Sequence, residues 1–252
     1  MKHTVPTERL LSDLKLSGIL SQLPARLKQA QEETLSPEDC LNLLLHDELE
    51  HRKNTRIHRL LKTATLKPQS CLEGIDYSIA RGIEKSQISD LSRCGFIKKG
   101  INILVLGPTG VGKSFLASAL GNCACRSGHT TIFSRMNTLL EQSAFARLKG
   151  TYLSFVKKYS SCDLLILDDF GIKPLTAQQF QDLYDILDER SEEKSTIVTS
   201  QVPPQNWNEV ISDPITCEAI TDRLISKGIT IQMKGQSYRK KKKEDLDQDC
   251  PL

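Results

Sequence analysis

The segment GPTGVGKS, from Gly107 to Ser114, constrains the fold of this chain more than any other feature. It fits the pattern G-x-x-x-x-G-K-[S/T], follows the apolar run 101–106 and precedes a helical pattern at 113–126. In this context the glycines let backbone N–H groups point at phosphate oxygens, and the helix adds the positive end of its dipole. Lysine brings a charge to the β and γ phosphates, and the serine hydroxyl ligates magnesium. The residues expected to hold the nucleotide are Gly107, Pro108, Thr109, Gly110, Val111, Gly112, Lys113, Ser114 and Phe115.

Short apolar runs alternate with helical patterns from residue 101 onward. Strands separated by helices predict a parallel sheet covered by helices on both faces. The fold class expected is therefore α/β, with a five-stranded P-loop core preceded by a small helical domain. The predicted strands are 101–106, 130–133, 164–167, 196–199 and 229–233, and the predicted helices of the core are 113–126, 138–148, 176–190 and a stretch that ends at 226.

The chain divides into four regions by composition. Residues 1–72 are predicted to be a helical domain that binds DNA or a partner, and 73–100 a connector that contains a short helix. Residues 101–239 form the nucleotide-binding core, and the polar, highly charged tail 240–252 is expected to be disordered.

A buried apolar strand that ends in two acids provides the second half of the nucleotide site. Asp168 and Asp169 follow the run 164–167, so they are expected at the carboxyl edge of the sheet, beside the phosphate loop. Asp168 would hold Mg²⁺ through water, and Asp169 would orient or deprotonate the attacking water. The alternative is an ordinary strand that ends in a solvated Asp-Asp turn. A dedicated acid beside the magnesium aspartate favours hydrolysis over the reaction of a small-molecule kinase.

Two further positions are candidates for catalysis. The fourth predicted strand ends in Ser200 and Gln201, and such a polar strand end can contact the γ phosphate or the water. Arg223 lies late on a helix before the last strand, where it could reach a neighbouring subunit's nucleotide as an arginine finger. The alternatives are an ordinary strand end and an ion pair of Arg223 with Asp222 or Glu218 on its own helix.

The N-terminal region predicts two helices and a basic face. Thr7 can cap the first helix, and Ser-Pro-Glu-Asp at 36–39 is a strong start signal for a second that should stop before Pro68. The stretch 51–72 has six Lys or Arg residues and no acid, and three of the arginines share one helix face. Such a face could contact DNA phosphates without reading sequence. The expected DNA-binding residues are Arg52, Lys53, Arg56, Arg59 and Lys62.

Each basic segment has a simpler explanation. The helix face could be solvated, with Arg52 paired to Glu48. The run from Arg239 to Lys243 is a second electrostatic patch, but the acids at 244, 245, 247 and 249 could neutralise part of it.

Taken together, these segments resemble the IstB-like ATP-binding proteins of insertion sequences, which are close kin of the DnaC helicase loaders among the AAA+ ATPases. The resemblance covers roughly residues 5–240. The phosphate loop and the Asp-Asp pair are shared by a very large superfamily, whereas the remaining segments are more particular. These are LLLHDELEHRKNTRIHRLLKTATL (43–66), CLEGIDYSIARGI (71–83), LDDFGIKPLTAQQ (167–179), STIVTSQVPPQNW (195–207), ITDRL (220–224) and KGQSYR (234–239).

The resemblance implies an ATP-dependent transposition helper. Such proteins bind ATP with Mg²⁺, assemble as homo-oligomers on double-stranded target DNA, remodel it, and recruit and stimulate the partner transposase, while hydrolysis controls disassembly. The loop Gly107–Ser114 matches Walker A, Asp168 and Asp169 Walker B, Gln201 with Ser200 the sensor, and Arg223 the finger. Asp169 stands where glutamate is usual in the superfamily, which implies slow or partner-stimulated hydrolysis. Few residues follow Met233, which implies a form without the helical lid, closed instead by a neighbouring subunit.

Other classes of protein fit the sequence less well. No apolar run is long enough for a membrane helix, and the first residues lack the features of a signal peptide. The eight cysteines include no CxxC pair, which predicts reduced thiols and a cytoplasmic protein. When bound to DNA, the protein is expected at the bacterial nucleoid. His46 and His51 are five residues apart, the wrong spacing for a zinc helix. The alternatives that stay open are a replicative helicase loader, a DNA-bound scaffold that does not hydrolyse ATP, and a small-molecule kinase.

Overall fold

The computed structural model describes residues 6–237 except 68, 78–81, 191–192 and 212. The chain forms two compact units, Met1–Arg59 and Leu60–Leu252. Helix α3 runs through the boundary between them.

The first unit consists of helices, as the sequence predicts. They are α1 (Thr7–Asp13), α2 (Ser17–Glu32) and α3 (Pro37–Ala64). The α3 start signal is confirmed, because the Ser36 hydroxyl accepts a hydrogen bond from the Asp39 N–H at 3.1 Å. Its end at Ala64 lies before Pro68, also as expected. Thr7 does not cap α1: Pro6 occupies the cap position, where its fixed φ suits a helix start and its missing N–H costs nothing.

A buried carboxylate joins α2 to α3 within this unit. The Glu48 side chain accepts hydrogen bonds from the N–H groups of Gly18 at 2.8 Å and Ile19 at 3.2 Å, at the start of α2. A Cβ at position 18 would lie 2.7 Å from the Glu48 Cα, so the close packing of the two helices requires glycine. The negative charge also complements the positive end of α2.

The second unit contains a parallel sheet of five strands in the order β2-β3-β4-β1-β5, counted over the described residues. In this part of the chain every pair of neighbouring strands is parallel, which confirms the predicted sheet. Strand β4 lies between β1 and β3, so their carboxyl ends flank its own. The strands are β1 (Asn102–Leu106), β2 (Thr131–Arg135), β3 (Leu164–Phe170), β4 (Ser195–Ser200) and β5 (Gly228–Gln232).

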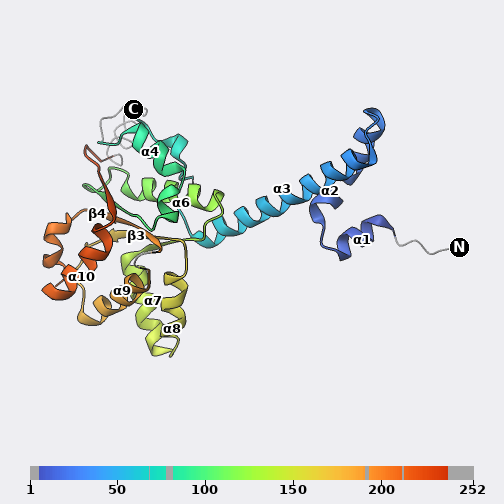
Figure 1. The fold of residues 1–252 in the computed structure, drawn as a ribbon. Coiled ribbons are helices and arrows are strands. Elements are labelled where there is room, and N and C mark those ends of the chain that lie inside the picture. The colour runs from blue at the N-terminus through green and yellow to red at the C-terminus, as the bar shows by residue number, and fades with distance from the viewer. Residues whose placement is uncertain (1–5, 68, 78–81, 191–192, 212, 238–252) are drawn as a thin grey trace, which may run out of the picture. The chain divides into compact units, whose positions relative to one another are not determined.

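Helices cover both faces of the sheet (Figure 1). Alternate residues of a strand point to opposite faces. Leu104 and Leu106 of β1 pack in one apolar cluster, and Ile103 and Val105 pack in the other. The first cluster lies under α7 (Met136–Leu148), α8 (Tyr152–Ser160), α9 (Ala177–Arg190) and α10 (Pro214–Ile225), and the second under α4 (Lys85–Ser92), α5 (Gly95–Lys98) and α6 (Lys113–Arg126).

Three helices of the described residues are not predicted as separate elements, namely α2, α5 and α8. Two short 3-10 turns, η1 (Leu72–Gly74) and η2 (Pro204–Glu209), also lie in the described part of the chain. Over the described residues, no helix combines the length and apolar character needed to cross a membrane.

Candidate nucleotide-binding site

The phosphate loop connects β1 to α6, as its sequence context predicts. Gly107, Gly110 and Gly112 have φ values of +152°, +85° and +104°. A Cβ on Gly107 would collide with the Met233 carbonyl oxygen, and one on Gly110 would collide with the Ser237 side chain. Glycine is therefore required twice over at these positions, by backbone conformation and by space.

Lys113 is the first residue of α6, and its ammonium group is folded back over the loop. Nζ donates hydrogen bonds to the carbonyl oxygens of Gly107 at 2.7 Å and Pro108 at 2.9 Å. Burial lowers the pKa of Lys113, while the charges of Asp169 and Asp168 act in the opposite direction. The loop thus holds a cation whose charged form is favoured by the two acids of β3.

Asp168 is fully buried near the end of β3. Its Oδ1 accepts a hydrogen bond from the Thr199 hydroxyl at 2.7 Å, and the same hydroxyl oxygen accepts the Asp169 N–H at 3.0 Å. One side chain of β4 therefore orients both acids.

Asp169 has a left-handed backbone, with φ of +62°, which is unusual for a residue other than glycine. The register between β3 and β4 shifts between Leu167 and Phe170, so the Asp-Asp pair forms an irregularity in the strand. In a regular strand, consecutive side chains would point to opposite faces. The irregularity redirects Asp169, which lines the same cleft as the phosphate loop.

The cleft has a volume of about 370 Å³. The Thr109 hydroxyl donates a hydrogen bond to Gln201 Oε1 at 2.6 Å, so the predicted sensor residue contacts the phosphate loop. Ser200 instead bonds backbone groups: it donates toward the Phe170 and Val202 carbonyls and accepts the Val202 N–H. The lining residues are Lys67, Thr109, Gly110, Gly112, Lys113, Ser114, Phe115, Arg135, Asp169, Ile172 and Gln201.

Three residues near the site escaped the sequence analysis. Arg135 and Thr199 stand near the carboxyl ends of β2 and β4, so the rule that placed Asp168 at the sheet edge could have found both. Lys67 was counted only among basic residues of the N-terminal region. No local pattern connects it with a carboxylate 101 positions later.

The donor set fits magnesium held jointly with a nucleotide. Ser114 and Asp168 offer oxygen atoms, which Mg²⁺ prefers, and Mg²⁺ is commonly held by one or two carboxylates together with phosphates. Within the described residues, no three His, Cys, Asp or Glu side chains are grouped to hold a metal without such help.

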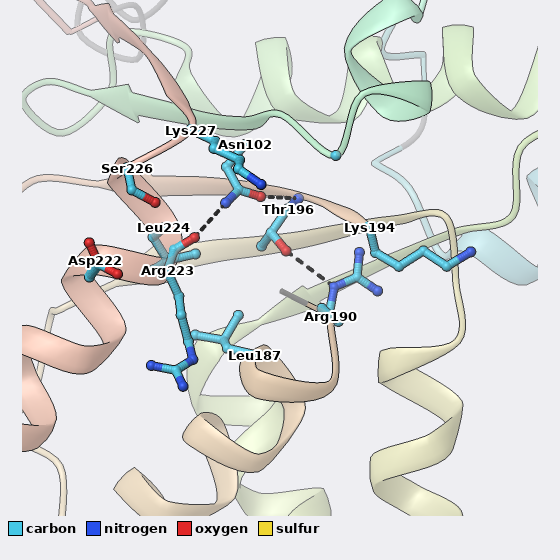
Figure 2. Close-up of a pocket in the computed structure, with 11 residues that line it drawn as sticks. Asn102, Leu187, Arg190, Lys194, Thr196, Asp222, Arg223, Leu224, Ser226 and Lys227 are labelled. Atoms are coloured by element: carbon cyan, nitrogen blue, oxygen red, sulfur yellow. Dashed lines mark hydrogen bonds between the residues drawn. The ribbon is translucent and has the colours of Figure 1, made fainter. Parts of the chain in front are cut away.

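Arg223 lies far from the phosphate loop of its own chain. Its carbonyl oxygen accepts a hydrogen bond from the Asn102 side chain at 2.8 Å, as Figure 2 shows. Asn102 begins β1, whereas the loop follows the other end of that strand, and five residues of strand span about 13 Å. Arg223 is therefore at the amino edge of the sheet and the loop at the carboxyl edge.

The Arg223 guanidinium contacts α9 as well as its own helix, where Nη1 donates to the Ala219 carbonyl at 3.1 Å. Nε lies 3.1 Å from Asp188 Oδ1, Nη2 donates to the Tyr184 hydroxyl at 2.8 Å, and the group lies 4.5 Å from the tyrosine ring centre. Its side chain is about one-quarter exposed. The ion-pair alternative named Asp222 or Glu218, and the structure shows a different partner, Asp188.

Two of the predicted DNA-binding residues of α3 form ion pairs with acids of the preceding turn. Arg52 Nε lies 2.6 Å from Glu48 Oε1 and Lys53 Nζ 3.3 Å from Glu50 Oε1, so the predicted Glu48–Arg52 pair exists. Arg56, Arg59 and Lys62 are exposed on the same helix. The run 239–243 lies outside the described residues.

The sheet order, the phosphate loop and the paired acids define a P-loop protein of the AAA+ class. Residues 9–245 match the family described as IstB-like ATP binding protein, and the chain belongs to that family. This confirms the resemblance drawn from the sequence.

Relatives over nearly the full chain carry names of the same kind. A protein of Sinorhizobium fredii named as an insertion sequence ATP-binding protein is 35% identical, over 93% of this chain and 96% of its own. A Mycobacterium tuberculosis protein named as an ATP-binding protein in an insertion sequence is 32% identical, over 92% and 93%.

Solved structures support the fold. AMPPCP-bound DnaA from Aquifex aeolicus superposes with a TM-score of 0.56 at 25% identity, over 75% of this chain and 58% of that one. The DnaC helicase loader superposes with a TM-score of 0.53 at 20% identity, over 69% and 96%.

Proposed function

We propose that this protein is a DNA-stimulated ATPase that assembles on double-stranded DNA and assists a partner transposase. The observation that carries the proposal is that Lys113 and Asp169 line one cleft, while the Thr199 hydroxyl is bonded both to the buried Asp168 carboxylate and to the Asp169 N–H. This arrangement supplies a phosphate-binding cation, a metal-holding carboxylate and a second carboxylate that faces the same cleft.

Hydrolysis follows from these positions. Asp169 accepts a proton from the attacking water while the water oxygen bonds to the γ-phosphorus and the bond to the β-phosphate oxygen breaks. Lys113 stabilises the charge that develops on the phosphate oxygens, and Gln201 borders the same cleft. Ser114 and Asp168 would hold Mg²⁺ together with the nucleotide, and the ion would supply neutralisation of phosphate charge. Asp169 then returns its proton to the products.

Arg223 completes the site of a neighbouring subunit. Arg223 lies at the amino edge of the sheet and its own phosphate loop at the carboxyl edge. Because it is too far from its own loop to contact a nucleotide there, this position supports action in trans. A contact in which one subunit's amino edge meets the next subunit's carboxyl edge is heterologous, so it can generate a ring or a spiral.

Contact with DNA is assigned to α3 in the helical region 1–72, through Arg56, Arg59 and Lys62 with Arg52 and Lys53. Backbone contacts of this kind suit loose target choice. The insertion-sequence names of relatives support the transposase as partner, whereas the similarity to the DnaC loader supports the fold alone. The assembly would act at the nucleoid of a bacterial cytoplasm.

The test is the ATPase rate with and without duplex DNA, measured alongside electron microscopy of the same samples. We expect hydrolysis to rise with DNA length as oligomers form on it. Assemblies that form with ATP but never hydrolyse it would support the scaffold alternative instead.

A further inference from the structure

The three residues after α3 are fixed to the core at several points. The Thr65 hydroxyl donates a hydrogen bond to the Phe133 carbonyl at 2.9 Å, on β2. Leu66 packs against Gly121 of α6, where a Cβ would lie 2.7 Å from its Cδ2 atom. The Lys67 N–H points at the Ser118 hydroxyl of the same helix, at 3.5 Å. The segment 65–67 is therefore positioned by both β2 and α6.

This anchoring places the Lys67 ammonium group on the metal-holding carboxylate. Nζ lies 3.2 Å from Asp168 Oδ2 and 5.8 Å from the centre of the Phe133 ring. The Asp168 side chain is completely buried, while the Lys67 side chain is one-third exposed and lines the nucleotide cleft. Because Thr199 bonds Oδ1, the two oxygens of Asp168 face different partners.

We infer that Lys67 and the metal ion are alternative counter-ions of Asp168. An ammonium group and a divalent cation on one buried carboxylate repel each other strongly, because their charges are little screened there. A bound Mg²⁺ would therefore release Lys67 from Asp168, and Lys67 would partly replace the metal when it is withdrawn. This inference rests on the proposed nucleotide site and names a residue that regulates it.

Replacement of Lys67 by the metal ion would also affect residues outside the nucleotide site. α3 ends at Ala64, three residues before Lys67, and carries the candidate DNA-binding residues. Release of Lys67 removes one of the attachments of segment 65–67, so the nucleotide state would change the mobility of the last turn of α3. The Lys67–Asp168 contact would thereby couple the binding of Mg²⁺ and nucleotide to the mobility of α3, the helix proposed to contact DNA.

The direct test compares Lys67→Met with the wild-type full-length protein. Binding of a fluorescent ADP is titrated with Mg²⁺ present and again with EDTA. Without Lys67, metal-free affinity falls and Mg²⁺ meets no competitor, so the ratio of the two affinities should rise about three- to tenfold. The matched control is Lys98→Met, an exposed lysine on α5, which should leave the ratio unchanged.

A second measurement distinguishes replacement of Lys67 by the metal ion from a merely structural Lys67–Asp168 ion pair. Amide hydrogen exchange in segment 65–67 and the last turn of α3 should speed up when wild type binds Mg·ADP, and should be fast from the start in Lys67→Met. The inference is overturned if the affinity ratio is unchanged in Lys67→Met, or if amide hydrogen exchange in wild type does not change when Mg·ADP binds. If wild type binds no nucleotide at all, the proposed function fails instead.

Discussion

The Thr199 hydroxyl lies 2.7 Å from Asp168 Oδ1 and donates a hydrogen bond to that buried carboxylate. The same oxygen accepts a hydrogen bond from the Asp169 N–H and so holds the backbone of the second acid. A single side chain of β4 thus links the residue assigned to the metal with the residue assigned to the water.

Replacing Thr199 with valine should impair hydrolysis and stability but not nucleotide binding. The buried carboxylate oxygen loses its donor, which should cost about 1–3 kcal/mol of stability and slow hydrolysis at least about tenfold. Nucleotide affinity should change little, because the phosphate loop is untouched. Chemical denaturation and single-turnover hydrolysis measure both effects. Thr199→Ser keeps the hydroxyl and should restore most activity; equal defects in both variants would argue against the hydrogen bond as the cause.

Lys113→Ala should abolish productive ATP binding. The variant removes the charge that faces the β and γ phosphates, together with two hydrogen bonds to the loop carbonyls. Nucleotide affinity and ATP-dependent DNA binding are the measurements. Wild-type values for both would rule out the assignment of this loop as the nucleotide site.

Asp169→Asn should keep ATP and DNA bound but stop turnover. The amide is close in size to the carboxylate, yet it cannot take a proton from water. The trapped protein should stay on DNA longer than wild type in a dissociation experiment. Normal hydrolysis in this variant would show that another group is the base.

Arg223→Ala should bind nucleotide nearly as well as wild type and hydrolyse it poorly. Mixing it with Lys113→Ala should restore some activity, since each variant supplies the half-site that the other lacks. Asp188→Asn is the control, because it breaks the Arg223–Asp188 pair but keeps the guanidinium. If Asp188→Asn loses as much activity as Arg223→Ala and no mixture recovers any, Arg223 is an ion-pair residue and the shared site is wrong.

The pair of changes Arg56→Gln and Arg59→Gln should weaken DNA binding for all sequences alike. Each lost phosphate contact lowers the slope of log affinity against log salt by about one. Binding measured across a salt series gives that slope. Arg93→Gln, an exposed position beyond α4, serves as the control and should leave the slope unchanged. A slope unaffected by the double change would place the DNA contact elsewhere.

The strands of the core and the helices 113–126 and 176–190 follow closely from apolar periodicity, because burial on a sheet or helix face leaves a regular pattern. Helix α2 was harder to foresee, because Pro24 lies in its interior. The phosphate loop and the Asp168-Asp169 pair could be predicted because each is a motif of contiguous residues. Lys67 and Thr199 meet Asp168 only through tertiary contacts 101 and 31 positions apart, and no local pattern encodes such pairs.

The bond between Asn102 and the Arg223 carbonyl has a consequence for any assembly of this protein. It keeps the arginine at one end of β1 while the phosphate loop occupies the other, so a row of subunits has two unlike ends. If Arg223 completes a neighbour's site as proposed, an open row would contain one fewer finished site than it has subunits, and a lone molecule would contain none. Such a row also has a direction, so the partner protein that meets it on DNA would find an arginine exposed at one end and an unfinished nucleotide cleft at the other.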